Sequence, residues 1–199
     1  TRRAPARKAT AIAAAAFAAA LAAAGIVGGL CATGAHALPT GIDETQTRTL
    51  TIHKFEQPPA QGVPGNGTAV DTTGLRPLDG VEYTVRQVTS YDGRAIDLTD
   101  TESWDRLPAA GTFDPARAVF AAPRVGTTEA DGSVTFGSAP SGGAGTGQSL
   151  PLGLYWVEHT GDGSHDILQR DAPFLVTVPM PGGAAGQWRY QVHAYPKSA

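Results

Sequence analysis

Residues 188–197 read WRYQVHAYPK and alternate between apolar and polar side chains. One face carries Trp188, Tyr190, Val192 and Ala194, and the other carries Arg189, Gln191 and His193. This period of two predicts a half-buried β-strand. Pro196 lacks an N–H group and cannot continue the hydrogen-bond ladder, so the strand is expected to end there. Lys197 then lies just past the strand with its amine in solvent.

Short segments of the same kind recur along the chain. Strands are predicted at residues 49–55, 81–88, 133–136, 152–160 and 173–179, with a hairpin turn at Asp131-Gly132. Residues 97–107 are the one predicted helix, in which Thr99 caps the start and Glu102 completes a capping box. Many short strands and little helix indicate an all-β fold of the β-sandwich kind, although the pattern alone does not separate a sandwich from a barrel.

The first 37 residues have the features of a secretory signal peptide. A basic start is followed by an uncharged Ala-rich run, and Ala35-His36-Ala37 offers the small-x-small site that signal peptidase favours. The run is long enough to span a bilayer, but Ala and Gly dominate it, which favours a cleaved signal-peptide helix over residues 1–37. Residues 38–199 are then one exported domain. Because the sequence starts at Thr1 rather than Met, we expect further residues before it.

Charge and cysteine count constrain the exported domain. The signal holds four of the fifteen basic residues and none of the eighteen acidic ones, so eleven basic residues remain and the net charge becomes −7. This acidic balance argues against nucleic acid or anionic lipid as a partner. Cys31 is the only cysteine and lies in the signal, so the domain has no disulfide.

Lysine is scarce in the exported domain. Residues 38–199 contain nine arginines but only two lysines, Lys54 and Lys197. A GC-rich genome accounts for the arginines, but not for the positions of the lysines. A guanidinium stays protonated and is a poor nucleophile, whereas an ammonium can lose a proton and attack. The two lysines are therefore candidates for chemistry at the amine.

The spacing W-x-x-x-V-x-x-Y-P-K is made by Trp188, Val192, Tyr195, Pro196 and Lys197, and it resembles the pilin motif of sortase-assembled pili of Gram-positive bacteria. Ala194 departs slightly from the family pattern, which usually has Val there. The resemblance implies that Lys197 attacks the thioester that a class C sortase forms with another subunit, which gives an intermolecular isopeptide bond. The implied partners are this pilin sortase and other copies of the subunit, with a host surface ligand left open.

Other segments extend the resemblance over the exported chain. Residues 50–54 and 77–83 resemble the start of an immunoglobulin-like, CnaB-type pilin domain, and residues 128–136 and 150–158 resemble its later hairpin and the strand that carries the family's glutamate. The resemblance identifies residues 38–199 as the N-terminal domain of a major fimbrial subunit. It implies that this domain is a fragment of a longer precursor that is secreted and built into a fimbria on the cell wall.

Lys54 and Glu158 form a second candidate site. Lys54 shares its predicted face with Leu50 and Ile52, and Glu158 shares its face with Leu154 and Trp156, so both are expected to point into the core. In CnaB-type domains such a lysine bonds covalently to an asparagine on the last strand, and the glutamate moves protons. The core-facing positions of residues 188–194 carry no amide or carboxyl group. We therefore predict a buried Lys54–Glu158 ion pair and no internal isopeptide bond.

The sequence does not predict an enzyme. It contains no G-x-S-x-G or H-E-x-x-H motif and no phosphate-binding glycine loop, and no cofactor or metal site is expected. Two other functions stay open. A cell-wall-anchored adhesin or stalk module would use the same fold without a reactive lysine, and a secreted hydrolase would need a convergent polar pocket.

Overall fold

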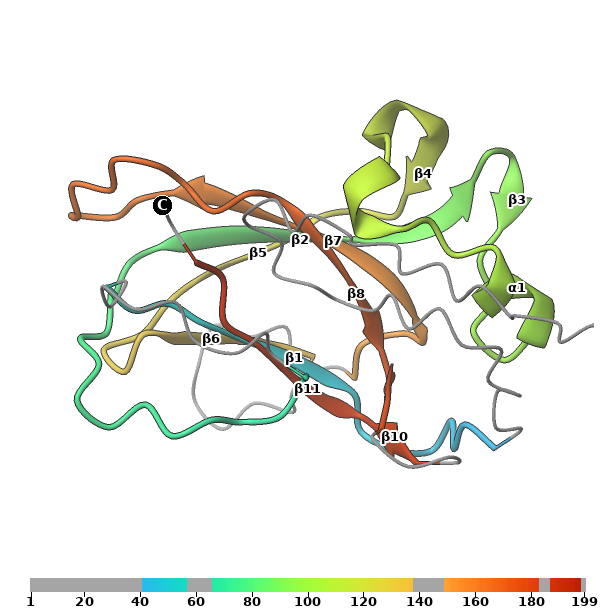
Figure 1. Ribbon diagram of the computed structural model, residues 1–199, viewed down its shortest axis with the longest axis horizontal. Helices are drawn as coiled ribbons and strands as arrows, with labels where there is room; N and C mark the ends of the chain where they lie inside the picture. The colour runs from blue at the N-terminus through green and yellow to red at the C-terminus, as the bar shows by residue number, and fades with distance from the viewer. Residues whose placement is uncertain (1–40, 57–65, 138–148, 183–186, 198–199) are drawn as a thin grey trace, which may run out of the picture.

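The computed structural model describes residues 41–56, 66–137, 149–182 and 187–197. The predicted signal peptide, its cleavage site and Cys31 lie outside these residues. The regular structure of the described part is mostly β-strand, and the strands are arranged in two facing layers (Figure 1). This arrangement confirms the predicted β-sandwich. Within the same ranges, no helix is long and apolar enough to cross a membrane.

The smaller layer has three strands in the order β11, β1, β6. β1 (Thr49–His53) pairs in parallel with β11 (Gln191–Ala194) and antiparallel with β6 (Ser133–Phe136). The register places Leu50 beside both Val192 and Phe136. Because side chains alternate along a strand, all three turn to the same face of the layer.

The larger layer is built around β2 (Glu82–Tyr91), which pairs antiparallel with β7 (Gly153–Gly161) along one edge. β7 in turn pairs with β8 (Phe174–Val178). Three shorter strands also pair antiparallel with β2: β3 (Arg94–Ala95), β4 (Ala118–Phe120) and β5 (Arg124–Thr127). A separate two-stranded ladder joins β9 (Met180–Pro181) to β10 (Trp188–Arg189).

The main core fills the space between the two layers. The smaller layer contributes Leu50, Ile52 and Val192, and the larger layer contributes Val85 and Val157, all at most 1% exposed. Burying a side chain of this kind stabilises the fold by about 1.5–3 kcal/mol. The contribution of the smaller layer to the core therefore depends on the alternation in residues 50–54 and 191–194.

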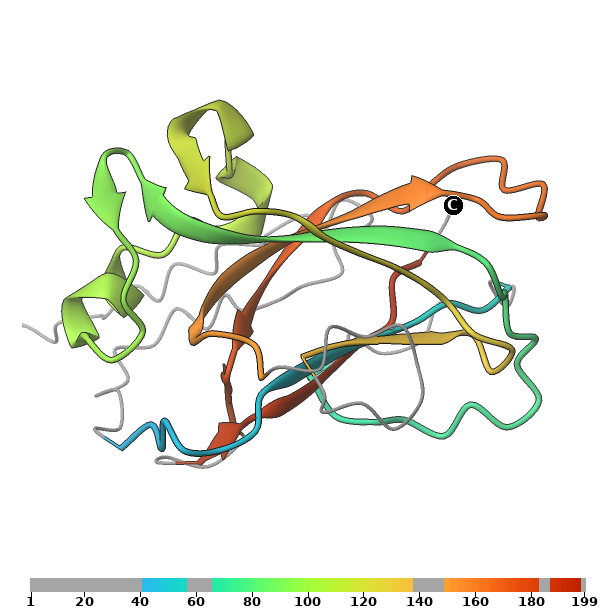
Figure 2. The same ribbon diagram turned by 180° about the vertical axis from the view of Figure 1, so that it is seen from behind.

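A second core covers the opposite face of the larger layer. Val88, Leu154, Trp156 and Leu175 are buried there beneath apolar side chains of residues 96–120. That segment includes α1 (Thr101–Asp105) and two 3-10 turns, Ala110–Thr112 and Pro115–Arg117 (Figure 2). β8 is consequently buried at all five positions. Strands β7 and β8 are thus covered on both faces.

Two local details differ from the sequence prediction. α1 is shorter than residues 97–107, and its cap is Asp100, whose carboxylate accepts hydrogen bonds from the backbone N–H groups of Glu102 and Ser103. The turn at Asp131-Gly132 is present, and Gly132 has a φ of +77°. However, the strands on either side of it, β5 and β6, pair in different layers. The turn is therefore a crossover between the layers and not a hairpin.

Candidate functional site

Strand β11 leads directly to Lys197. Val192 and Ala194 face the core, as predicted, and the ladder with β1 ends at Ala194. Pro196 is buried and Lys197 is exposed. The exposed amine therefore follows a chain end that is packed against the domain. In both ribbon views this end lies away from α1 (Figures 1 and 2).

The predicted single strand from Trp188 to Tyr195 is in fact two. Trp188 belongs to β10 and pairs with Pro181 of β9, while β11 begins at Gln191 and pairs with β1. Tyr190 lies between the two strands, and its hydroxyl accepts a hydrogen bond of 2.6 Å from the backbone N–H of Asp43. The predicted alternation holds only from Gln191 onward: Trp188, Arg189 and Tyr190 are all half-buried, and Trp188 and Tyr190 lie outside the main core because the chain changes its partner strand there. Trp188 packs on Trp104 of α1, with ring centroids 5.1 Å apart.

Tyr195 is anchored on two sides just before the lysine. Its ring stacks on His53, with centroids 4.5 Å apart and planes 6° apart. Its hydroxyl accepts a hydrogen bond of 3.0 Å from the backbone N–H of Val70. His53 Nε2 lies 2.9 Å from His193 Nδ1. The outward positions of both histidines follow from the alternation, but their pairing was not predicted.

Both imidazoles have a pKa below the ordinary value for histidine. Burial lowers the pKa of His53, the nearby His193 lowers it further, and the carboxylate of Asp131 raises it. Burial also lowers the pKa of His193. The neutral form of each ring is thereby favoured, and in a neutral pair one nitrogen donates while the other accepts.

Lys54 does not pair with Glu158, so that prediction is wrong. Lys54 is fully buried, and its Nζ donates a hydrogen bond of 2.6 Å to Oδ1 of Asp171, whose side chain is 2% exposed. Glu158 instead forms an ion pair with Arg86 on the neighbouring strand β2. The side chains of that second pair are 33% and 27% exposed.

The prediction of a Lys54–Glu158 pair failed because β7 is apolar on both faces. Glu158 does share a face with Leu154 and Trp156, but that face packs under residues 96–120. Lys54 points into the main core, which the opposite face of β7 lines with Tyr155 and Val157. The partner, Asp171, comes from the segment just before β8, where no strand periodicity could identify it.

The buried charge pair is part of a larger polar cluster. Tyr83 Oη donates a hydrogen bond of 2.6 Å to Oδ2 of Asp171, and the backbone N–H of Asp171 donates to Nδ1 of His159 at 3.3 Å. Burial raises the pKa of Tyr83, and so does the adjacent charge of Asp171, which keeps the phenol protonated as a donor. Because Lys54 follows β1 while Tyr83 and His159 lie in β2 and β7, the cluster ties the two layers together.

The two lysines that the structure describes therefore have opposite environments. Lys54 is 0% exposed and lies inside the sandwich, where an external protein cannot reach its amine. Lys197 is exposed at the end of β11. Of these two residues, only Lys197 is accessible from outside the domain.

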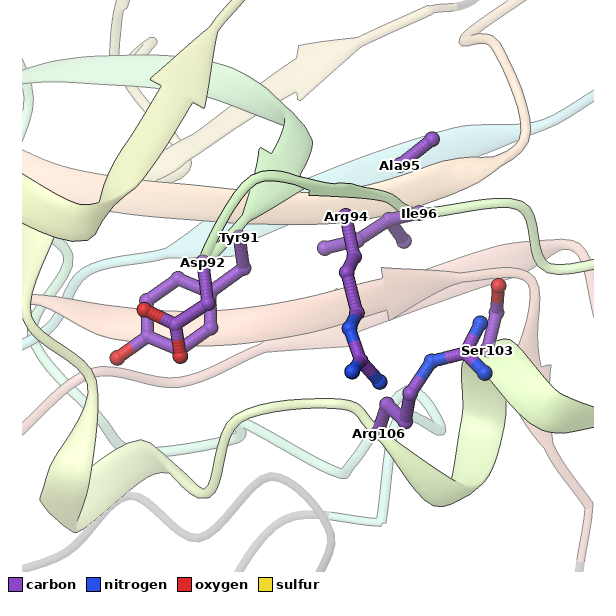
Figure 3. Close-up of a pocket in the computed structure, with 7 residues that line it drawn as sticks. All are labelled: Tyr91, Asp92, Arg94, Ala95, Ile96, Ser103 and Arg106. Atoms are coloured by element: carbon purple, nitrogen blue, oxygen red, sulfur yellow. The ribbon is translucent and has the colours of Figure 1, made fainter.

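A pocket of about 400 Å³ lies near α1 (Figure 3). Its lining consists of Tyr91, Asp92, Arg94, Ala95, Ile96, Ser103 and Arg106. Arg106 forms a salt bridge of 2.9 Å with Glu102, and Asp92 pairs with Arg117. The lining holds no pair of a nucleophile and a base, and it belongs to the α1 end of the molecule. Among the described residues, no group of three or more His, Cys, Asp or Glu could hold a metal ion.

Comparison with known proteins identifies similar chains. The family model described as "Gram-positive pilin subunit D1, N-terminal domain" matches residues 45–199. Fimbrial subunit type 2 of Actinomyces naeslundii is 34% identical over 160 residues, which cover 75% of this chain and 29% of that protein. Fimbrial subunit type 1 of Actinomyces viscosus is 31% identical over 182 residues, 84% of this chain and 31% of that protein.

A solved structure has a similar fold. The full-length major pilin SpaD of Corynebacterium diphtheriae is similar with a TM-score of 0.60 and 25% sequence identity. The similarity covers 79% of this chain and 33% of that one. The chain thus spans about a third of the length of the curated relatives that it matches.

Proposed function

The chain belongs to the Gram-positive pilin subunit D1, N-terminal domain family, and on that premise we propose that Lys197 is the amine through which this domain is joined to another subunit. The domain is part of a structural fimbrial subunit, as its similarity to two fimbrial subunits supports. Residues 1–37 act as an export signal in this proposal, and residues 38–199 are the N-terminal domain of a longer precursor. The product is a covalent polymer on the cell surface.

One observation carries the proposal: Lys197 is exposed directly after a strand end that is packed against the domain. Val192 and Ala194 fix the strand in the core. The two residues before the lysine are also held, because Tyr195 is stacked on His53 and Pro196 is buried. A fixed strand end limits the positions that the amine samples. Holding a nucleophile near its target removes much of the entropic cost of a bimolecular reaction.

The proposed reaction is acyl transfer from a sortase. A class C sortase holds the C-terminal residue of one subunit as a thioester, and the neutral Lys197 amine attacks the thioester carbonyl carbon. The C–S bond breaks, the cysteine thiolate leaves, and the amine nitrogen loses a proton as the amide forms. An ordinary lysine is almost entirely protonated at neutral pH, so a base of the sortase removes the proton before attack. The domain supplies only the acceptor amine, which is consistent with a structural role.

The test is labelling by a pilin sortase with a peptide that carries a sorting signal. Wild-type protein is expected to gain one peptide, and peptide mapping should place the new amide at Lys197. Lys197→Arg is expected to abolish labelling. A matched control adds Arg94→Lys to Lys197→Arg, which moves an exposed amine to a site away from β11. Labelling of Lys197→Arg at the wild-type rate would contradict the proposal, and labelling of the control at position 94 would show that exposure alone suffices.

A further inference from the structure

We propose that His53 and His193 form a clamp on Tyr195, and that this clamp positions Lys197 for acyl transfer. We call His53, His193 and Tyr195 the histidine clamp. The inference rests on the proposed function of Lys197. It assigns a positioning role to His53, which lies in β1, more than a hundred residues before the motif in the sequence.

The clamp is built by the parallel pairing of the first and last strands of the smaller layer. The register sets Thr51 beside His193 and Ile52 beside Ala194, so His53 lies next to the point where the chain leaves β11. The three side chains occupy the outer face, opposite Ile52 and Ala194 in the core. The imidazoles are stacked with centroids 5.2 Å apart and joined at 2.9 Å. The His53 ring is stacked on Tyr195 in turn.

Lys197 is close enough in sequence to follow any movement of Tyr195. Two residues of extended chain span at most about 7 Å, so the lysine backbone stays within that distance of the tyrosine. Pro196 lies between them, and its fixed φ limits how far the backbone of the lysine can rotate relative to that of the tyrosine. A misplacement of about 1 Å can cost roughly a hundredfold in rate, so a clamp of this kind can control the reaction.

The histidine pair also makes the clamp sensitive to acid. The pair needs one bare nitrogen as acceptor, so it survives the first protonation but not the second. Second protonation also places two positive rings against each other. Two groups act on the charge of His53: the carboxylate of Asp131, on the turn before β6, raises its pKa, and His193 lowers it. The edge of β11 that does not pair with β1 contacts a backbone group: the backbone N–H of His193 donates a hydrogen bond of 3.0 Å to the carbonyl of Gly67.

The first experiment measures acyl transfer to Lys197 at saturating sorting-signal peptide with the exported domain as acceptor. His53→Ala is expected to lower kcat about ten- to a hundredfold, while the KM for the peptide changes less than twofold. Thr51→Ala is the matched control, because Thr51 lies on the same strand and face but bonds to Thr135 of β6. It should keep the wild-type kcat. Thermal unfolding of each variant shows that the compared proteins are folded.

The second experiment is a pH profile. His53→Gln keeps hydrogen-bonding groups at this position but cannot take up a proton near neutral pH. At each pH, the rate of the wild type is divided by the rate of His53→Gln. Any effect of pH on the sortase itself is the same for both acceptors and cancels in this ratio. We expect this ratio to fall several-fold as the pH is lowered from 7 to below the ordinary imidazole pKa of about 6.5, once the second ring of the pair takes up its proton. A flat ratio would contradict the acid sensitivity.

A third measurement does not depend on the sortase. Amide hydrogen exchange at Tyr195 and Lys197 is expected to speed up in His53→Ala and to stay unchanged in Thr51→Ala. If His53→Ala shows wild-type kcat and exchange while Lys197→Arg is unlabelled, the clamp is wrong and the acceptor role stands. If Lys197→Arg is labelled like wild type, the acceptor role fails and the positioning role fails with it.

Discussion

Removal of either charge from the buried Lys54–Asp171 pair should destabilise the domain strongly. Both side chains are at most 2% exposed, so neither charge can be solvated when its partner is lost. Breaking a buried ion pair from one side typically costs about 3–5 kcal/mol. For a domain of this size, each kcal/mol lowers the melting temperature by about 2–4 °C. Asp171→Asn or Lys54→Met alone should therefore lower it by roughly 6–20 °C.

The double variant Lys54→Met/Asp171→Asn tests whether these costs belong to the pair. With both charges absent, no uncompensated ion stays in the core, and the hydroxyl of Tyr83 can still donate to the amide oxygen at position 171. The double variant should be more stable than the sum of the single effects predicts, with a coupling energy of about 2–3 kcal/mol. Urea unfolding followed by tryptophan fluorescence gives the four free energies of the cycle.

Glu158→Gln is the matched control for this cycle. Glu158 pairs with Arg86 at a partly exposed position, where ion pairs contribute about 0.2–1 kcal/mol. Its substitution should shift the midpoint only slightly. If Glu158→Gln is as destabilising as Asp171→Asn, or if the two single variants at Lys54 and Asp171 are additive, the assignment of the buried partner is wrong.

Three further predictions concern the covalent state, a turn and acid stability. The intact mass of the folded domain should equal its sequence mass, because two donors stabilise the Asp171 carboxylate and a carboxylate is a poor electrophile; a mass lighter by one water would show an isopeptide bond with Lys54. Gly132→Ala should cost more than Gly93→Ala in urea unfolding, since both glycines have positive φ but only the first would place a Cβ 2.5 Å from a backbone carbonyl oxygen; the positive φ alone costs about 1–2 kcal/mol, and equal losses would contradict the crowding. The lowered pKa values of His53 and His193 mean that the unfolded chain binds more protons as the pH falls below about 6.5, so stability should decrease from there, and the decrease should be smaller in His53→Gln; equal slopes in thermal unfolding between pH 5 and 7 would oppose this.

Alternation along single strands was sufficient to predict much of the fold. It placed Leu50, Ile52 and Lys54 on one face and Val192 and Ala194 on the inner face of the last strand, and the structure confirms these positions. These residues obey a local rule because buried residues alternate with half-buried ones from Leu50 to Lys54 and from Val192 to Ala194. The end of the ladder before Pro196 is likewise local, since proline has no N–H to donate.

The partner of Lys54 could not be predicted in the same way. β7 is apolar on both faces, and nothing within the strand indicates which face meets which layer. Asp171 lies outside the strands, so only the three-dimensional path of the chain brings it to Lys54. The sequence indicated the histidine pair only weakly: His53 and His193 occupy outward positions on two predicted strands, but nothing in the sequence places those strands side by side. Their contact follows from the parallel pairing of β1 and β11, which the sequence pattern did not reveal.

The pairing of β1 with β11 also constrains when the domain can be completed during folding. Thr49 is aligned with Gln191, so the smaller layer is completed only when residues from both ends of the domain have come together. Contacts this distant in sequence form late in folding, because a long loop must close first. The ring of His53 therefore meets Tyr195 only in a finished domain. If Lys197 is the acceptor amine as proposed, a misfolded or truncated domain would lack an ordered acceptor, and the fold itself would act as a check before polymerisation.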